Sequence, residues 1–392
     1  MSPIPGLAMH HQVVHRDPYA YSAHPHLLAA APDNWLLVFT QSRRRAGTVL
    51  HPPQDPLYGN MIVRSGDEGR TWSQPSIVPD FGWQGVECAG LTALSDGTIL
   101  LNQWRFGWHT LAHAEAHMEP GTYDRPERLM GANAMAAELG DWTQEQATIA
   151  ERFPWVRAGG ETWVHRSVDG GRTFTASSRI DTAPFTGGYG MRGAVEVDGE
   201  IILPLSDVPH YQSVYVVRSR DGGESWSAPS LVASGDGHAF EEPAPLKLRS
   251  GRVVILLRDN VTRILHVVQS DDGGSTWSAP TPTGIPDYPA DLVELADGRI
   301  ACVAGRRRPP FGITLYLSED GGTTWNADRP LSASSGLPNR DLGYPSVALR
   351  ADGSLFVAYY CQDGDGVTGI EASMLAADWS YSRRQGGVDG QR

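Results

Sequence analysis

The sequence predicts an all-β protein folded as a six-bladed β-propeller, and three observations carry that prediction. A serine-to-aromatic motif recurs five times along the 392 residues. Its serines lie 102, 52, 51 and 48 residues apart, and a unit that repeats near 50 residues is typical of propellers and arrays. Six tight-turn signals also lie between pairs of short apolar runs, which is a strong hairpin pattern.

The recurring motif has serine first, aspartate third, glycine fifth and an aromatic residue last. An aspartate at that position can accept hydrogen bonds from turn N–H groups and nearby hydroxyls, while the glycine permits positive φ. We therefore interpret the motif as a structural turn rather than as a source of catalytic groups. It resembles the Asp-box of the sialidase superfamily. The copies begin at Ser65, Ser167, Ser219, Ser270 and Ser318.

The hairpin turns divide the chain into six units. Each unit is expected to contain strand a, a tight turn, strand b, strand c, the motif and strand d. The sixth unit lacks the motif, and we expect the N-terminal residues 9–15 to supply its outer strand and so close the ring. The turns lie at Asp33-Asn34, Asp96-Gly97, Asp198-Gly199, Ser250-Gly251, Asp297-Gly298 and Asp352-Gly353.

The second unit contains an insertion at residues 106–160. Its alanine-rich runs, 111–118 and 129–139, are expected to be helical. The segment carries Trp108, Tyr123, Trp142 and Trp155. A long insertion on a propeller is often part of the site rim, and a lid that serves only stability is the alternative.

A row of three histidines opens this insertion. His109, His113 and His117 follow i, i+4, i+8 spacing and would share one helix face. Such a row can bind zinc, but no carboxylate motif accompanies it. We therefore favour a solvated or packed histidine face and expect neither a metal nor a cofactor.

Composition limits the partners of the chain. A net charge of −13 argues against nucleic acid or an anionic membrane as partner. The three cysteines are scattered, and no stretch approaches the roughly 20 apolar residues of a membrane span. Residues 1–18 lack a secretory signal, so a cytoplasmic protein is expected, although a trimmed secreted form would look the same. We expect one domain over 1–380 and a disordered tail over 381–392; the oligomeric state stays open.

A site in a propeller draws side chains from the inner strands around the central channel. Counting from the turns, strand a offers Pro25, Cys88, Gly190, Glu242, Pro289 and Tyr344. Strand b offers Gln41, Trp104, Ser206, Arg258, Gly305 and Tyr360. Glu242, Tyr344 and Arg258 are polar groups that need partners on a packed strand. A purely structural Glu242–Arg258 ion pair is the alternative to a site.

The resemblance to sialidases covers essentially the whole chain and extends to these residues. Their blade-four glutamate resembles Glu242 in Phe-Glu-Glu-Pro, and the arginine of the next strand resembles Arg258 in Leu-Leu-Arg-Asp. Their nucleophilic tyrosine resembles Tyr344 in Leu-Gly-Tyr-Pro-Ser. Their acid/base aspartate precedes the first Asp-box, as Asp55 does here.

The chemistry explains why these residue types belong together. Sialic acid carries a carboxylate on its anomeric carbon, which repels an anionic nucleophile but not a neutral tyrosine. Because a tyrosine pKa is about 10, Tyr344 needs a base, and the resemblance gives that role to Glu242. Asp55 would protonate the leaving oxygen and later activate water. Arginines would hold the substrate carboxylate.

Two departures from the family concern that carboxylate. The first arginine of sialidases is replaced by Ala23-His24-Pro25-His26, and a supporting glutamate by Tyr360-Cys361. We expect His24 or His26 to contact the substrate and ordinary sialosides to be poor substrates. Further candidates for substrate binding are Arg192, Trp104, and Arg306, Arg307 or Arg308 as the third arginine.

These observations predict a retaining exo-glycosidase that hydrolyses a terminal, sialic-acid-like sugar. A related exo-glycosidase for a non-sialic sugar is one alternative. A non-catalytic carbohydrate-binding propeller is another, although binding alone would need no activated nucleophile. The sugar and its linkage do not follow from the sequence.

Overall fold

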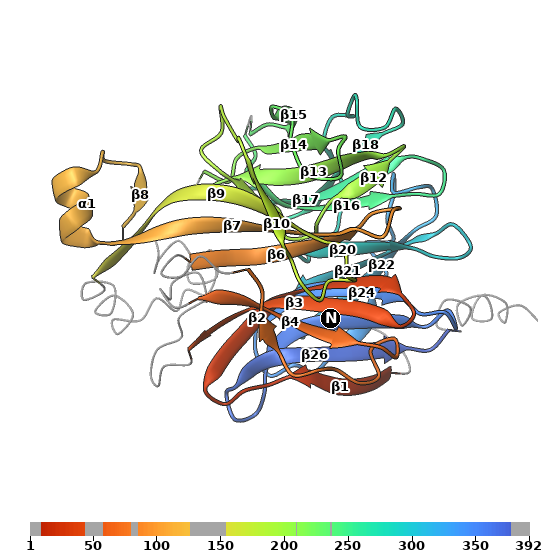
Figure 1. Ribbon diagram of the computed structural model, residues 1–392. Helices are drawn as coiled ribbons and strands as arrows, with labels where there is room; N and C mark the ends of the chain where they lie inside the picture. Colours follow the sequence, from red (N-terminus) through yellow and green to blue (C-terminus); the bar gives the residue numbers. More distant parts are fainter. Residues whose placement is uncertain are drawn as a thin grey trace, which may run out of the picture.

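The chain forms six β-sheets arranged as the blades of a propeller (Figure 1), which confirms the predicted architecture. The computed structural model describes residues 9–43, 58–79, 85–125, 154–208, 210–235 and 237–377. Within these ranges there is a single short helix, so the fold is nearly all β. None of the helical structure described is long and apolar enough to cross a membrane.

The first three blades take up the N-terminal half of the chain. Blade one contains β2 (Ala20–Ala31), β3 (Asn34–Arg43), β4 (Gly59–Ser65) and β5 (Ser76–Ile77). Blade two contains β6 (Gly85–Ala93), β7 (Ile99–Thr110), β9 (Trp155–Ser167) and β10 (Ala176–Ile180), with β8 (Tyr123–Asp124) paired to β9. Blade three contains β11 (Gly188–Tyr189), β12 (Val195–Val197), β13 (Glu200–Asp207), β14 (Val214–Ser219) and β15 (Ser230–Ala233).

The last three blades follow the same order of strands. Blade four contains β16 (Phe240–Lys247), β17 (Val253–Asp259), β18 (Leu265–Ser270) and β19 (Thr281–Pro282). Blade five contains β20 (Ala290–Glu294), β21 (Ile300–Arg306), β22 (Gly312–Ser318) and β23 (Leu331–Ser335). Blade six contains β24 (Leu342–Leu349), β25 (Leu355–Gln362), β26 (Thr368–Leu375) and, at its edge, β1 (Met9–His15).

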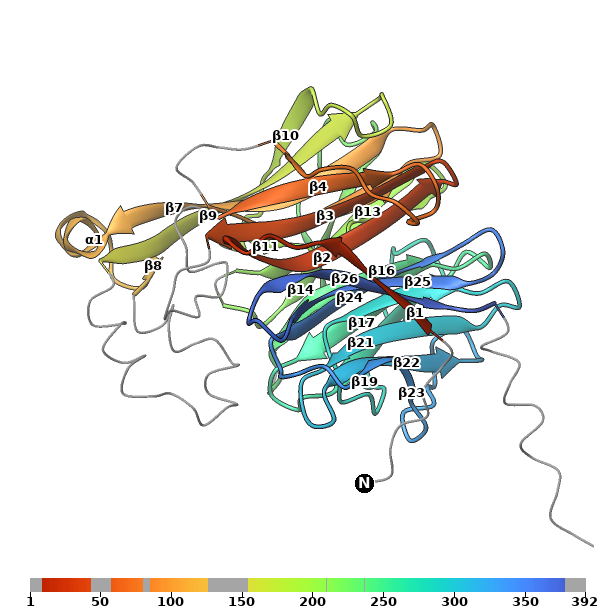
Figure 2. The ribbon, with the colours of Figure 1, turned by 90° about the horizontal axis from the view of Figure 1, so that it is seen from below.

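The ring is closed by the N-terminal strand, as predicted. β1 pairs antiparallel with β26, from Met9 opposite Leu375 to His15 opposite Ile370. Figure 2 shows this first strand on the blade formed by the last strands of the chain. The sixth blade therefore combines both ends of the sequence.

The blades pack face to face, which explains why their middle strands are mostly apolar and buried. All seven residues of β17, β21 and β22 are buried. One interblade core brings Leu36 and Val38 of blade one against Leu91 and Leu101 of blade two. Strands buried on both faces lose the alternation of a half-exposed strand, and this holds the inner strands in fixed positions around the channel.

The Asp-box motif forms the local turn that its residue types predict. In the blade-four copy, Ser270 Oγ accepts from Gly274 N at 2.7 Å and donates to Asp272 Oδ1 at 2.7 Å. Asp272 also accepts from the backbone N of Thr276 at 2.9 Å and from its Oγ1 at 2.6 Å. Gly274 has φ +77°, a conformation open to glycine. These hydrogen bonds lower the pKa of Asp272 to about 2, although burial acts weakly in the opposite direction.

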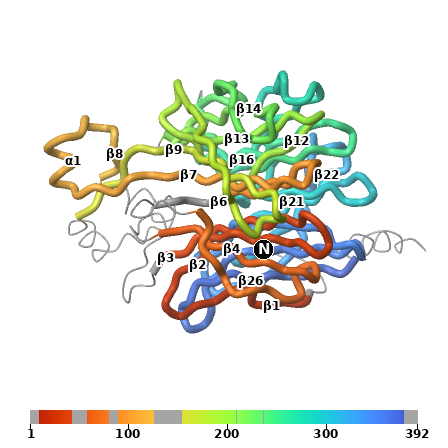
Figure 3. Tube along the Cα trace, in the orientation of Figure 1, coloured from red at the N-terminus to blue at the C-terminus, as the bar shows by residue number. Residues whose placement is uncertain are grey.

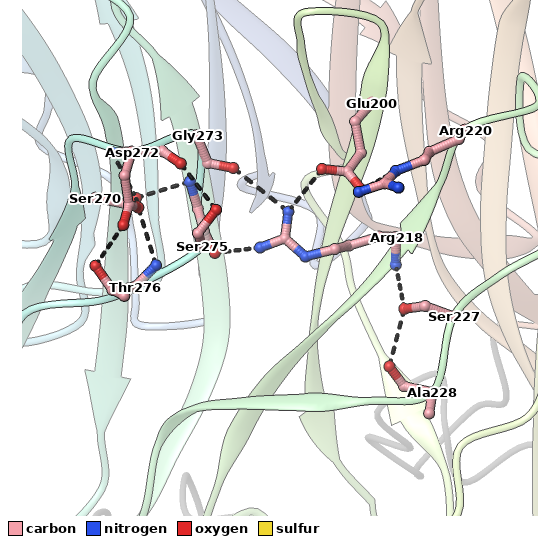
Figure 4. A network of polar contacts seen from close by, with 11 residues as sticks. Glu200, Arg218, Arg220, Ser227, Ala228, Ser270, Asp272, Gly273, Ser275 and Thr276 are labelled. Carbon is pink, nitrogen blue, oxygen red and sulfur yellow. Dashed lines mark hydrogen bonds and ion pairs between the residues drawn. The ribbon is translucent and has the colours of Figure 1, made fainter.

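The Asp-box turns also tie neighbouring blades together. Arg218 of blade three donates to the carbonyls of Gly273, at 3.4 Å, and Gly274 in the blade-four motif (Figure 4). Glu200 holds the same guanidinium at 3.1 Å. Equivalent side-chain donors reach the carbonyls of Gly69, Gly171 and Gly321 from Gln12, Arg64 and Gln269. Between blades two and three, Arg166 pairs instead with the carboxylate of Glu224.

The insertion in blade two begins as an extension of two strands. The sequence predicted an insertion between the strands at residues 106–160, but β7 continues to Thr110 and β9 already begins at Trp155. Between them lies α1 (Leu111–His117), which confirms the first predicted helix. The trace in Figure 3 shows this arm extending away from the other blades. Residues 129–139, the second predicted helix, and the tail 381–392 fall outside the described residues.

Candidate active site

Three blades present a side chain from the same unusual backbone conformation at the start of their first strand. His24, Glu242 and Tyr344 have φ of 54°, 53° and 47°, and each is followed by proline. Each also lies at a register shift between the first two strands of its blade. Positive φ is costly for residues other than glycine, and such strain gathers at functional sites.

Counting from the turns placed Pro25 at this position in blade one, and the structure corrects that to His24. The offset arises because the count in blade one started from Asn34, which already belongs to β3 and pairs with Ala31. In the other blades the count starts from a glycine that precedes strand b. The side chain that takes its place beside Glu242 and Tyr344 is therefore an imidazole.

Tyr344 and Glu242 are in direct contact. The hydroxyl of Tyr344 donates a hydrogen bond to Glu242 Oε1, and both side chains are buried. The other oxygen, Oε2, accepts from Arg258 Nη1 at 3.1 Å. The backbone N of Glu242 donates to Ser206 Oγ at 2.9 Å, which ties the backbone at Glu242 to blade three. A hydroxyl bonded to a fixed carboxylate is the arrangement of an activated nucleophile and its base.

Arg258 is shared between two carboxylates. Besides Glu242, its Nε lies 3.3 Å from Glu241 Oε1, and Asn260 Nδ2 donates to the same oxygen at 2.7 Å. Its guanidinium also lies 4.4 Å from the ring centre of Tyr288. Burial opposes the charge of Arg258, but the two glutamates raise its pKa well above the ordinary value. Burial raises the pKa of Glu241.

Sequence reasoning did not identify Glu241. Strict alternation along a strand would direct it to the face opposite Glu242. The register shift between Glu241 and Ala244 breaks that alternation, so that both carboxylates reach Arg258. The doubled Glu-Glu before a proline is the signal that could have indicated a bulge.

Of the three candidate arginines at the end of β21 and directly after it, the structure brings Arg307 to the Tyr344–Glu242 pair. Its Nε donates to Leu342 O at 2.9 Å and its Nη2 to Tyr360 Oη at 3.2 Å, while its guanidinium lies 5.3 Å from the Tyr344 ring centre. Although burial opposes its charge, interaction with Tyr360 and Tyr344 raises the pKa of Arg307.

Arg306 and Arg308 are directed elsewhere. Arg306 donates to the carbonyls of Pro310 and Pro309, at 3.1 and 3.4 Å. Arg308 pairs with the buried Asp287. Both residues therefore support the loop that carries Arg307, and the structure does not bring them to Tyr344.

The two candidate histidines also separate. The His24 ring lies 4.2 Å from the Tyr344 ring and 5.7 Å from the Tyr360 ring, between centroids. His26 instead accepts a hydrogen bond from the backbone N of Leu91 at 2.9 Å through Nδ1. Burial lowers the pKa of His26 to about 4. We therefore reassign His26 to the scaffold and retain His24 at the site.

Arg192, a predicted substrate ligand, is likewise committed to the scaffold. Its guanidinium donates to the carbonyls of Ala290, Pro25 and Pro345 at 3.0, 3.0 and 2.9 Å. These carbonyls belong to blades five, one and six, so an arginine of blade three links four blades. The contacts use all three nitrogens of the guanidinium, so its burial is explained without a substrate.

Trp104 does not present its ring to Tyr344 either. It is 2 % exposed, packs on Phe106 with 4.9 Å between ring centres, and has the Arg157 guanidinium 5.2 Å from its ring centre. These contacts assign it to the base of the blade-two arm. The predicted acid/base, Asp55, lies outside the described residues, and so does the side chain of Cys88.

A second polar pair lies beside Arg307. The Tyr21 hydroxyl donates to Asp341 Oδ1 at 2.5 Å, and Thr368 Oγ1 donates to Asp341 Oδ2 at 2.6 Å. Burial raises the pKa of both Tyr21 and Asp341, and Arg307 counteracts part of each increase. No sequence signal identified this pair, because its members lie 320 residues apart.

Comparison with known proteins agrees with the fold and the motif. Residues 136–357, more than half of the chain, match the family of the BNR repeat-like domain. A sialidase from Micromonospora viridifaciens is 26 % identical over 228 residues. That match covers 56 % of this chain but only 31 % of the sialidase, so the chain spans less than a third of that relative.

Solved structures share the propeller at low sequence identity. A Dyadobacter fermentans protein of unknown function gives a TM-score of 0.75 at 22 % identity, over 95 % of this chain and all of the other. The NanB sialidase of Streptococcus pneumoniae gives 0.64 at 12 % identity, over 94 % and 71 % of the two chains. The intramolecular trans-sialidase of Ruminococcus gnavus gives 0.61 at 15 % identity, over 92 % and 95 %.

Proposed function

Because this chain belongs to the BNR repeat-like family and has the six-bladed sialidase fold, we propose that it is a retaining exo-glycosidase. The observation that carries the proposal is the hydrogen bond from Tyr344 to Glu242. A scaffold has little need for a buried tyrosine in a left-handed backbone conformation whose hydroxyl meets an ion-paired carboxylate. An enzyme that uses tyrosine as nucleophile needs both features.

In the proposed reaction, Tyr344 transfers its phenolic proton to Glu242 Oε1 as its oxygen attacks the anomeric carbon. The glycosidic C–O bond breaks, and its electron pair leaves with the aglycone oxygen. Asp55, by resemblance to the family, protonates that oxygen. The same residue then takes a proton from the water that cleaves the glycosyl–tyrosine bond, and Glu242 returns its proton to Tyr344. Two displacements retain the anomeric configuration.

The charges around Tyr344 bear on the substrate. Arg258 and Arg307 contribute two positive charges, and Glu241 and Glu242 contribute up to two negative charges. Arg258 is already held by both glutamates, so Arg307 is the guanidinium whose described partners are a carbonyl and a hydroxyl. We infer that a substrate carboxylate would rely mainly on Arg307.

His24 and Tyr360 complete this side of the site with neutral hydrogen-bonding groups. Their rings lie edge to face beside Tyr344, in place of the arginine and glutamate of sialidases. Imidazole and phenol groups suit sugar hydroxyls. The preferred substrate class is therefore a terminal acidic sugar other than sialic acid. Its carboxylate would be bound by a different set of residues from the one that sialidases use.

The test is a hydrolysis screen over aryl glycosides that includes sialic acid, related keto-acid sugars and neutral sugars. Turnover of one class, its loss in Tyr344→Phe and labelling of Tyr344 by a fluorinated analogue of that sugar would support the proposal. Binding of a sugar without turnover by the wild type would instead favour a carbohydrate-binding propeller.

A further inference from the structure

A second group of potential ligands lies at the end of blade four. Within the described residues, His238, Asp259 and His266 form a group whose ligand atoms all lie within 4.8 Å of one another. His238 Nδ1 is 2.8 Å from Asp259 Oδ2, and His266 Nδ1 is 4.0 Å from the same oxygen. Ligand atoms in a tetrahedral zinc site lie about 3.4 Å apart, given bonds of about 2.0–2.2 Å.

We propose that His238, Asp259 and His266 bind a divalent transition-metal ion of the zinc type. Two imidazoles and one carboxylate are a donor set that such ions accept. The side chains of Asp259 and His266 are 0 % and 4 % exposed, whereas His238 is 35 % exposed. The open side at His238 provides an entry path for the ion and leaves room for a water ligand.

The surroundings of Asp259 fit a metal-binding carboxylate. Its Oδ1 accepts from the backbone N of Ala239 and of Val261, at 2.9 and 3.1 Å. Thr262 donates to Oδ2 through Oγ1 at 2.6 Å and through its backbone N at 3.3 Å. Bonds of this kind orient a monodentate ligand, and their presence is a usual feature of metal sites. The ion would replace the proton that His238 and Oδ2 now share.

The two histidines are also held in place. The rings of His238 and His266 pack on Phe240, with centroids 5.0 and 5.4 Å from its ring centre. His266 Nδ1 lies 3.2 Å from the carbonyl of Ile264. To bind the metal through this nitrogen, the imidazole must lose that contact. His238 Nδ1 must also move about 0.6 Å away from Asp259 Oδ2 to reach the spacing of a tetrahedral site.

Occupancy would stabilise a turn that supports the candidate active site. Asp259 directly follows Arg258, and the next residue, Asn260, holds Glu241 at 2.7 Å. A metal at Asp259 would fix the segment that carries Arg258 and Asn260. The proposal concerns binding and stability, so it stands independently of the glycosidase activity.

The test is zinc binding to the full chain after chelator treatment and dialysis, measured by calorimetry and by cobalt absorption spectroscopy. We expect one zinc per chain and a zinc-dependent rise in Tm. His238→Ala should weaken binding at least about tenfold, since loss of even an outer-shell partner costs 10- to 100-fold. The Tm rise should shrink accordingly.

The matched control is the double variant His113→Ala/His117→Ala. It removes two exposed histidines of α1 whose ring centres lie 4.8 Å from each other. It should bind zinc as the wild type does. The proposal fails if the wild type binds no zinc at micromolar concentration, or if binding is lost in the α1 variant and kept in His238→Ala. Should His238→Ala unfold, His238→Gln replaces it, with circular dichroism as the check.

Discussion

The hydroxyl of Tyr344 in blade six donates its hydrogen bond to Glu242 in blade four, across 102 residues of sequence. The two residues share a positive-φ backbone and a following proline. Both blades therefore present a side chain from the same local backbone conformation. The two side chains meet only because the blades are arranged in a ring.

Tyr344→Phe should abolish turnover while preserving the fold. The ring and its contact with His24 remain, and only the hydroxyl is lost. We expect kcat/KM to fall by at least about a thousandfold, as for loss of a nucleophile, and the free energy of unfolding to change by less than about 2 kcal/mol. Steady-state kinetics and urea unfolding give both quantities. Wild-type turnover in this variant would exclude Tyr344 as nucleophile.

Glu242→Gln and Glu241→Gln form a matched pair, because both carboxylates contact Arg258 but only Glu242 contacts Tyr344. We expect Glu242→Gln to lower kcat by about 10²–10⁴, the usual contribution of a general base. Glu241→Gln should lower it less than tenfold. Equal losses in the two variants would indicate that the carboxylates act only by positioning Arg258.

Ordinary sialosides should be weak substrates of the wild type. A substrate carboxylate lacks one charge-assisted contact where His24 replaces an arginine, and each such contact is worth about 1.5–3 kcal/mol, or about ten- to hundredfold in affinity. The double variant His24→Arg/Tyr360→Glu should lower KM for an aryl sialoside. Efficient sialoside cleavage by the wild type, unchanged in His24→Ala, would contradict this reading of the site.

The Asp-box carboxylates should make stability depend on acid. The pKa of Asp272 is lowered to about 2 by its hydrogen bonds, so its stabilising contribution is present above the ordinary carboxyl pKa and is lost as pH falls through the folded value. Asp272→Asn should destabilise the protein at pH 7, and its difference from the wild type should shrink between about pH 4 and pH 2. Urea unfolding at several pH values measures this.

The control for that experiment is Asp328→Asn. Asp328 is a largely exposed residue that pairs with Arg329, and such surface pairs contribute little. The free energy of unfolding of Asp328→Asn should equal that of the wild type at every pH. If the difference in free energy of unfolding between Asp272→Asn and the wild type stayed constant at every pH, the hydrogen bonds of the motif would not be the cause of the acid sensitivity.

Local patterns predicted much of the fold. The Asp-box depends on residues within eight positions of one another, and the hairpin turns on two adjacent residues, so both could be identified without tertiary information. The pairing of β1 with blade six followed from counting strands per unit. Glu242, Tyr344 and Arg258 were identified because polar side chains on buried strands require partners.

What could not be predicted depends on distant backbone. Arg307 differs from Arg306 and Arg308 only through the positions of Leu342 O and Tyr360 Oη. Arg192 was mistaken for a substrate ligand because its three acceptor carbonyls belong to other blades. His24 was displaced by one position because Asn34, from which blade one was counted, belongs to β3 and not to the turn. The length of the blade-two arm was missed because β7 and β9 continue through Gly107, Gly159 and Gly160, and glycine within a segment weakens a strand pattern.

The N-terminal strand in blade six has a consequence for how the chain is made. β1 is synthesised before the other described strands of the propeller, yet its partner, β26, is synthesised after them. Until then β1 has no edge to join, and blade six cannot be completed. Contacts of such high sequence separation slow folding, and an unpaired strand edge favours association between chains. A nascent or truncated chain should therefore depend on chaperones more than the finished ring does.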